Sequence, residues 1–458
     1  MTKHRKTARV IPGARRLIIS MRDLGYGPTE AIADLVDNSV AAGAHSVEIT
    51  LHFDGGDSWI RIADDGRGMD AEMITEAMRY GAARDYGADD LGKFGLGLKT
   101  ASMSQCRCLT VASRTSKSVA RVEARQLDLD YIEDHDAWDI LIVGAAERSE
   151  SLIGPLKEHR GTVVLWEDLD RILTYQDPGG GWARRHMIKL AERLDAHLGM
   201  VFHRFLAGEV PRKKLKITIN DVMVDPWDPF ARDEPQTEAG RSEDVELNTA
   251  AGSGIVHFAP YTLPPKASFS SDPAWRRMSG PNSWNRQQGF YIYRASRLIQ
   301  SGGWSNMRTA DEHTKLARIA LLFSPELDAA FGINVAKMRV TLPPELSDRI
   351  EAPVNRAVKR ARTVYDAKPD QARPQRPSGK ATDAAAARGP GSHGNGHVGE
   401  SIVSGDEHRA VAATITVAQM RREALESAAG AAGEQAALRR IINALSKEAP
   451  EVARDLGF

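Results

Sequence analysis

The stretch that decides the fold is Thr29-Glu-Ala-Ile-Ala-Asp-Leu-Val-Asp-Asn-Ser-Val-Ala-Ala-Gly43. Its periodicity predicts an amphipathic helix, whose inner face carries Ile32, Leu35, Val36, Ser39 and Val40. On the opposite face Glu30, Asp34 and Asn38 stack four residues apart, with Asp37 beside them. No Lys or Arg is interspersed, so the acidic groups repel one another unless a cation lies there. The stretch is either an ordinary acidic helix face or part of a cation site.

Two strands follow this helix, at residues 46–53 and 59–63, where apolar and polar residues alternate. The second strand runs directly into Asp64-Asp-Gly-Arg-Gly-Met69. Glycines placed just after a strand end allow a tight bend and the close approach of a flat ligand. An Asp at the mouth of such a turn can accept a hydrogen bond from an amino group. The alternative is a plain Asp-Gly turn.

A glycine-rich run, Gly92-Lys-Phe-Gly-Leu-Gly-Leu-Lys-Thr100, comes after a small-residue loop typical of a mobile lid. The run opens a helix, so its free backbone N–H groups and the positive helix end favour an anion. Lys93 and Lys99 add positive charge. It is not a Walker A loop, because Leu98 separates Gly97 from Lys99, and no Rossmann fingerprint fits.

Taken in order, four motifs resemble the signature of the GHKL ATPases, the superfamily that holds DNA gyrase, the ninety-kilodalton heat-shock chaperones, histidine kinases and MutL. These motifs are Asp34-Leu-Val-Asp-Asn38, Asp64-Asp-Gly-Arg-Gly68, Gly92-x-Phe-Gly-x-Gly-x-Lys99 and Gly161-Thr162. The third is most similar to the MORC branch. Further segments resemble the transducer-type domain of that branch: 198–206, 217–221, 228–230, 289–294 and 333–337. In total the resemblance covers roughly residues 10–365.

The resemblance implies a site for ATP and Mg²⁺. Asp34 would act as general base on the attacking water, and Asn38 would bind the Mg²⁺. The adenine amino group would bond Asp64 directly and Thr162 through a water. The adenine pocket would be shaped by Gly66, Gly68 and Met69, and the phosphates would be held by Lys93, Phe94, Gly95, Gly97 and Lys99. Lys337 would reach the terminal phosphate from the second domain and report the nucleotide state to it.

In two places the chain departs from the family pattern. Asp34 stands where the family usually has Glu, so its carboxylate lies about 1.5 Å further back. A misplacement on the order of 1 Å can cost about a hundredfold in rate, and we therefore expect an ATPase with slow turnover. Ala41 replaces the family's next Asp, a change for which the sequence gives no functional reason. Glu30, a turn further away, is the reserve candidate for the base, although a structural role is favoured.

Composition sets wider bounds. The chain has 458 residues, a formal net charge of +0 and 2 cysteines. This length predicts two or three domains. Cys106 and Cys108 are too close for a disulfide staple and indicate a reducing compartment. Neither an apolar run of membrane-spanning length nor a signal peptide is present, so we expect a cytoplasmic protein without membrane contact. Zero net charge excludes a globally basic DNA-binding protein but leaves local basic patches.

We predict an α+β fold: a two-layer α/β sandwich of the Bergerat (GHKL) type, then a second α/β transducer-like domain and a helical C-terminal tail. The predicted ranges are 1–178 for the ATP-binding domain, 179–365 for the transducer-like (S5-type) domain, 366–408 for a disordered linker and 409–458 for the helical segment. Basic residues that are either solvated or contact nucleic acid occur in two groups: Arg356, Lys359, Arg360 and Arg362, and Lys213, Lys214 and Lys216.

Two classes of function remain open. In the first, ATP closes a homodimeric clamp that slow hydrolysis reopens, with DNA as a candidate partner. In the second, the chain is a chaperone-like or signalling module that remodels a protein client. A nucleotide-binding scaffold without turnover is the third alternative. A sensor histidine kinase is disfavoured, because there is no room upstream for a dimerising hairpin with a phosphoacceptor His.

Overall fold

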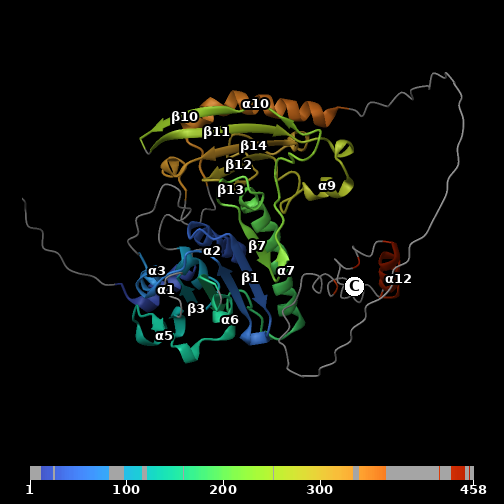
Figure 1. Ribbon diagram of the computed structural model, residues 1–458. Helices are drawn as coiled ribbons and strands as arrows, with labels where there is room; N and C mark the ends of the chain where they lie inside the picture. Colours follow the sequence, from blue (N-terminus) through green and yellow to red (C-terminus); the bar gives the residue numbers. More distant parts are fainter. Residues whose placement is uncertain are drawn as a thin grey trace, which may run out of the picture. The chain divides into compact units, whose positions relative to one another are not determined.

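The computed structural model describes residues 12–23, 26–81, 97–115, 121–157, 159–250, 252–333, 340–367 and 435–448, together with Arg422 and Ala453. Most of these residues belong to two lobes, each of which is built on its own β-sheet (Figure 1). The predicted α+β class is confirmed. Within the described ranges, no helix combines the length and the apolar character needed to cross a membrane.

The first lobe contains eight helices and eight strands among the described residues. The helices are α1 (Ala14–Arg22), α2 (Pro28–Ala41), α3 (Ala71–Met78), α4 (Gly97–Met103), α5 (Leu129–His135), α6 (Glu150–Ile153), α7 (Gly181–Val201) and α8 (His203–Leu206). The strands are β1 (Ser46–His52), β2 (Trp59–Asp64), β3 (Cys108–Arg114), β4 (Glu123–Asp128), β5 (Leu141–Ile142), β6 (Gly161–Glu167), β7 (Lys216–Ile219) and β8 (Val222–Met223).

In the first sheet the strand order is β5-β4-β3-β6-β2-β1-β7-β8. Neighbouring strands are antiparallel except β1 and β7, which are parallel. The predicted domain boundary at residue 178 falls between β6 and α7. The sheet nevertheless continues beyond it, since α7 returns the chain so that β7 and β8 complete the edge next to β1.

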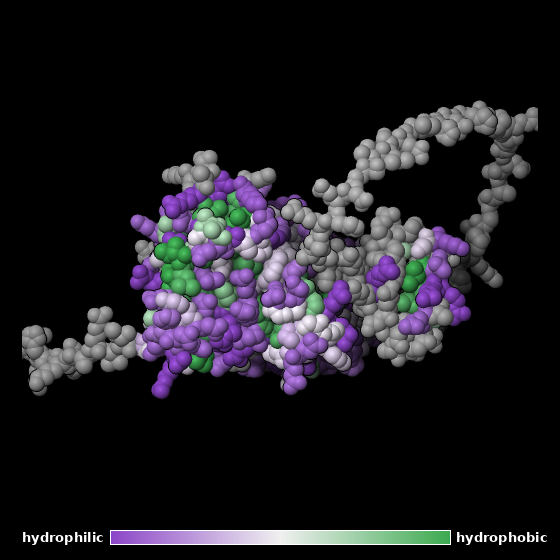
Figure 2. Space-filling model, turned by 90° about the horizontal axis from the view of Figure 1, so that it is seen from below, coloured by the Kyte–Doolittle hydropathy of each residue, from purple (hydrophilic) through white to green (hydrophobic). Residues whose placement is uncertain are grey.

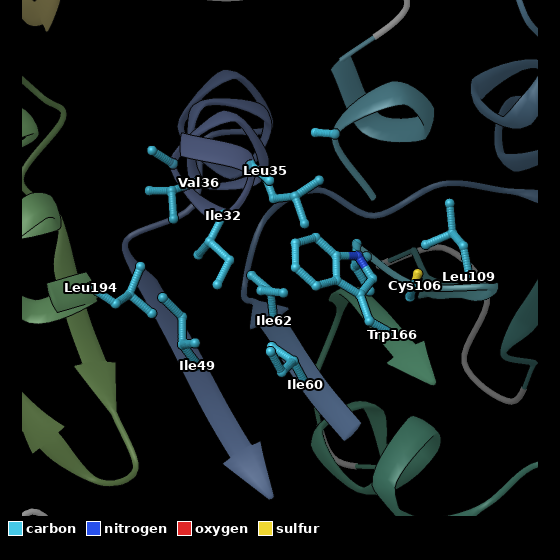
Figure 3. Packing of buried hydrophobic residues seen from close by; sticks show 14 of the residues in the cluster. Ile32, Leu35, Val36, Ile49, Ile60, Ile62, Cys106, Leu109, Trp166 and Leu194 are labelled. Carbon is cyan, nitrogen blue, oxygen red and sulfur yellow. The ribbon is translucent and has the colours of Figure 1, made fainter. Parts of the chain in front are cut away.

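One face of this sheet carries the main core. Ile32 and Leu35 of α2 point toward the strands and lie in one cluster with Ile62 and Trp166, while Val36 of the same cluster points to the side of the helix (Figure 3). All five side chains are at most 2% exposed. At roughly 25 cal/mol per Å² of buried apolar surface, each such side chain contributes about 1.5–3 kcal/mol, so the core fixes α2 firmly against the sheet. The other face is covered in part by Leu152 of α6 and Leu156, which pack on alanines and valines of β2, β3, β4 and β6.

The second lobe has a six-stranded sheet in which β10, β11, β14, β12 and β13 lie in that order and β9 pairs with β11. Its elements are β9 (Glu238–Ala239), β10 (Glu243–Thr249), β11 (Gly252–Thr262), α9 (Asp272–Arg277), β12 (Gly289–Arg294), β13 (Arg297–Ser301), β14 (Ala317–Phe323) and α10 (Pro344–Asp366). The long helix α10 lies across the sheet and buries Leu346, Ile350 and Val354 against it (Figure 1).

Most of the basic residues expected on α10 are engaged in ion pairs. Arg360 makes two bonds to the carboxylate of Glu238, at 2.6 and 2.5 Å. Arg356 lies 3.4 Å from Glu243, and Arg362 pairs with Asp311. These arginines therefore fasten α10 to its own lobe, which favours the structural interpretation over nucleic-acid contact.

The rest of the chain is described only in part. Helix α12 (Gln435–Glu448) falls inside the segment predicted to be helical. The predicted linker at 366–408 lies almost entirely outside the described residues, as does most of the tail. Both cysteines are buried and free of a disulfide.

On the face shown in Figure 2 the surface is mostly hydrophilic, and its hydrophobic areas are separate patches. Single exposed apolar side chains are ordinary on protein surfaces, and none of these patches by itself indicates a docking site.

Candidate functional site

Helix α2 begins at Pro28, and Pro is common in the first turn of a helix. The helix is followed by Gly43 with a left-handed φ of 75°, which is a common way for a helix to end. The burial of its acidic face differs from that of a solvated helix. Asp34 and Asp37 are 3% and 0% exposed, whereas Asn38 is exposed. An ordinary solvated acidic face is therefore excluded for the two aspartates.

Both oxygens of the Asp34 carboxylate have partners. Tyr26 donates its hydroxyl hydrogen to Oδ2 at 3.0 Å, and the guanidinium of Arg297 lies 4.0 Å from Oδ1. The first residue of α4, Gly97, is also close: a Cβ placed on it would lie 3.7 Å from Oδ2. The end of the glycine-rich run and the predicted base are thus brought together.

The turn after β2 is built around the carboxyl group of Asp64. It accepts hydrogen bonds from the Gly66 N–H and from the Ser39 hydroxyl of α2, both at 2.9 Å. Burial raises the pKa of Asp64 above its ordinary value. The two hydrogen bonds lower this pKa, but their effect is smaller than that of burial. Gly66 has little room, because a Cβ there would lie 2.9 Å from both Ala42 Cβ and Asp64 Oδ1.

Thr162 lies opposite Asp64 in the β2–β6 ladder. The Ser113 hydroxyl on β3 lies 3.0 Å from the Thr162 hydroxyl and accepts a hydrogen bond from the Met69 N–H at 2.8 Å. Asp64, Met69 and Thr162, which the sequence assigned to one adenine pocket, are therefore neighbours. Ser113 joins them without having been predicted.

The ammonium group of Lys99 is buried and bonds backbone carbonyls at the end of α3. Its Nζ donates to Ala77 O at 2.8 Å and to Arg79 O at 2.7 Å. Burial lowers the pKa of Lys99 to about 8, so the group is still charged at neutral pH. In this structure the charge satisfies a helix C-terminus. Its predicted role in phosphate binding stays a prediction.

Four of the predicted site residues lie outside the described part of the chain. They are Lys93, Phe94, Gly95 and Lys337. Their predicted contacts with the phosphates stay predictions. Glu30, the reserve candidate for the base, accepts a hydrogen bond from the Thr29 hydroxyl at 2.8 Å, at the start of its own helix.

The donor set fits an adenine nucleotide with Mg²⁺. The carboxyl of Asp64 can accept from an exocyclic amino group, and Asn38 presents a neutral oxygen at the one exposed position among residues 31–40. Mg²⁺ takes one or two protein oxygens together with phosphate oxygens and water. Among the described residues no three His, Cys, Asp or Glu side chains gather to hold a metal, so Asn38 would act with the phosphates rather than within a protein cage.

Comparison with known proteins agrees with this geometry. Residues 26–162 match the model of a family described as Histidine kinase-, DNA gyrase B-, and HSP90-like ATPase. This segment is a GHKL ATPase domain. The predicted superfamily is therefore confirmed, and the GHKL domain contains the predicted positions from Asp34 to Thr162. The closer likeness to the MORC branch stays a prediction.

Relatives of the GHKL domain include proteins named DNA mismatch repair protein MutL. The protein from Chromohalobacter salexigens is 28% identical over 179 residues, which are 39% of this chain and 24% of that protein. The one from Rhodospirillum rubrum is 27% identical over 199 residues, 43% and 28% of the two chains. That of Gemmatimonas aurantiaca is 32% identical over 126 residues, 26% and 21%. The matched segments span about a quarter of these relatives.

Two further site residues were missed by the sequence reasoning, beside Ser113. Tyr26 lies eight positions before Asp34, and its spacing gave no signal, because it precedes the first residue of α2 by two positions and lies outside the helical repeat. Arg297 is 260 positions from Asp37. A signal for it did exist, namely the unbalanced negative charge of α2, but the sequence could not say which of its many basic residues would balance it.

Proposed function

We propose that the chain binds ATP with Mg²⁺, hydrolyses it slowly, and works as an ATP-gated homodimeric clamp. One observation carries the first part: two motifs far apart in the sequence both meet α2. Asp64 bonds Ser39 near the end of the helix, and Gly97 lies close to Asp34 near its middle. This convergence is what a nucleotide needs in order to be held at its base and at its phosphates simultaneously.

In this proposal the residues have distinct tasks. Asp64 accepts from the adenine amino group and Thr162 assists through a water. Gly66 and Gly68 allow the tight turn after Asp64, and with Met69 they shape the pocket around the base. Mg²⁺, when bound through Asn38, spreads the negative charge of the phosphates. Asp34 orients the attacking water and takes its proton. The start of α4 at Gly97, with Lys99, Lys93, Phe94 and Gly95, holds the phosphates, and Lys337 reaches the terminal one.

Slow turnover follows from the length of the Asp34 side chain. It is one carbon shorter than Glu, and its carboxylate is held by Tyr26 and Arg297. The Asp34 carboxylate therefore ends about 1.5 Å short of the place that a Glu carboxylate would reach. A displacement of a catalytic group on the order of 1 Å lowers the rate about a hundredfold.

DNA is the proposed target of the clamp. The relatives are named as DNA mismatch repair proteins, and the first lobe has a basic cavity of about 300 Å³. His45, Arg67, Arg212 and Lys213 line this cavity, and none of the residues that line it is acidic. Lys214 and Lys216 are exposed next to it along the chain. Because the α10 arginines are ion-paired, this cluster is the better candidate for phosphate contacts. The homodimer and the cytoplasmic location stay predictions.

Binding of labelled ATP tests the nucleotide site. Asn38→Ala and Asp64→Ala, each shown to be folded by circular dichroism, are expected to lose most ATP affinity. Asp57→Ala, at an exposed position between β1 and β2, is the matched control and should bind as the parent does. Unchanged affinity in both site variants would place the nucleotide elsewhere. Gel filtration with a non-hydrolysable ATP analogue tests the dimer, which should appear only with the analogue.

A further inference from the structure

Arg297 begins β13 in the second lobe, yet its guanidinium contacts the acidic helix of the first lobe. We propose that Arg297 is a positioning residue for ATP hydrolysis, which fixes the carboxylate of Asp34 and so makes the reaction depend on the second lobe. This inference rests on the proposed ATPase function. It adds a residue that lies outside all four sequence motifs.

The hairpin that carries Arg297 has an unusual turn. Ala295 and Ser296, which join β12 to β13, both have left-handed φ values, 45° and 71°. Two consecutive positive φ values suit a tight hairpin, but side chains with a Cβ rarely adopt them. Before the turn, Arg294 makes two bonds to the buried Asp328, at 2.6 and 2.9 Å. Arg204 of α8 donates to the Ser296 hydroxyl at 3.3 Å. The turn is thus held from both lobes, and Arg297 follows it directly.

Arg297 supplies the positive charge that the buried aspartates require. Its Nε lies 3.3 Å from the Asp37 carboxylate and its Nη2 lies 4.0 Å from Asp34 Oδ1. Desolvation lowers the pKa of the nearby His197 to about 4, so this imidazole is neutral at pH 7. Buried carboxylates left without a cation are strongly unfavourable. Arg297 therefore offsets part of the negative charge of Asp34 and Asp37 together.

The geometry also explains why the effect should be on the chemical step. Tyr26 donates a hydrogen bond to Oδ2 of Asp34 while the charge of Arg297 attracts Oδ1, so both carboxylate oxygens have a partner. Without Arg297, the two carboxylates would repel each other and Asp34 would rotate away from Asp37. The Asp34 carboxylate would then no longer be oriented toward the attacking water. The described contacts of Arg297 include neither Asp64 nor Asn38, and ATP binding should persist.

Steady-state kinetics on the full chain test this proposal. Arg297→Met is expected to lower kcat by about tenfold or more while KM for ATP stays within about threefold, the pattern of a loss confined to the transition state. Arg297→Lys should recover part of the rate, because Lys keeps the charge but lacks the planar fork. Arg276→Met, an exposed arginine on α9, is the matched control and should behave as the parent.

A double-mutant cycle supplies a second readout that does not depend on turnover. Urea unfolding of Arg297→Met, Asp37→Asn and the double variant should show that the double variant loses less stability than the sum of the single ones. Additive losses would overturn the inference, as would an Arg297→Met enzyme at least as fast as the parent, or a joint change in kcat and KM. A parent that binds ATP without any turnover would also overturn it but leave ATP binding intact. Failure to bind ATP at all would instead overturn the proposed function.

Discussion

The Ser39 hydroxyl donates a hydrogen bond to the Asp64 carboxyl at 2.9 Å, which links the acidic helix to the end of β2. This bond stabilises the ionised carboxylate, while burial stabilises the protonated form. Burial dominates, and the pKa of Asp64 lies above its ordinary value of 3.8. This proposed adenine acceptor therefore gains its proton at a higher pH than an ordinary Asp does.

ATP affinity should therefore fall at low pH as Asp64 becomes protonated, and we call this fall the acid limb of the binding profile. As the pH falls through its raised pKa, the carboxyl loses its charge and becomes a weaker acceptor for the adenine amino group, so affinity drops. Ser39→Ala removes an effect that lowers this pKa, so the limb should move to higher pH. Equilibrium ATP binding, measured as the pH is lowered from neutrality, follows the shift. Protonation of ATP itself is common to all variants, and Ser253→Ala on β11 is the control. A limb that stays in place in Ser39→Ala would contradict this assignment.

Changing the length of the base should alter turnover. Asp34→Glu restores the missing carbon and is expected to raise kcat, by up to about a hundredfold if the carboxylate distance is the main defect. Asp34→Asn cannot take a proton and should lower kcat by about tenfold or more. Release of labelled phosphate under single-turnover conditions measures both. If Asp34→Asn matched the parent, the role given to Asp34 would be wrong.

Gly68 should be the glycine of the Asp64 turn that tolerates substitution least. Its φ is 69°, and a Cβ there would overlap the carbonyl oxygen of Arg114. Gly68→Ala should therefore lower the free energy of unfolding by about 2 kcal/mol or more. Gly56→Ala is the control, since a Cβ at Gly56 meets nothing within 4 Å. Urea unfolding compares the two, and equal stabilities would show that the turn relaxes without cost.

Two triple variants with the same loss of charge separate the candidate DNA contacts. Replacement of Lys213, Lys214 and Lys216 by Ser is expected to weaken binding of duplex DNA and to reduce its salt slope by about one for each lost phosphate contact. Replacement of Arg356, Arg360 and Arg362 by Ser removes residues that pair with acidic side chains. It should lower stability but leave DNA affinity within about twofold. Fluorescence anisotropy at several salt concentrations measures both, and the reverse ranking would place the DNA on α10.

The local sequence pattern was sufficient to predict several helices, strands and turns of the first lobe. The spacing of apolar residues in 29–43 predicted α2 and the face it buries, because a period of 3.6 residues per turn places these residues on one side of the helix. Alternation predicted β1 and β2, and the glycines after β2 predicted the turn at Asp64. The acidic composition of α2 left two alternatives open, an ordinary solvated face or a site with a cation close to it.

The sequence by itself determined the elements and the motifs, since these depend on neighbours a few positions apart. Only the tertiary structure decided that Asp34 and Asp37 are buried, that Arg297 faces them, that β7 joins the first sheet beside β1, and that Lys99 bonds the end of α3. The physical reason is that a buried charge must be balanced by whichever opposite charge the packed chain brings within a few ångströms. Which residue that is depends on how distant segments pack, and no local spacing records it.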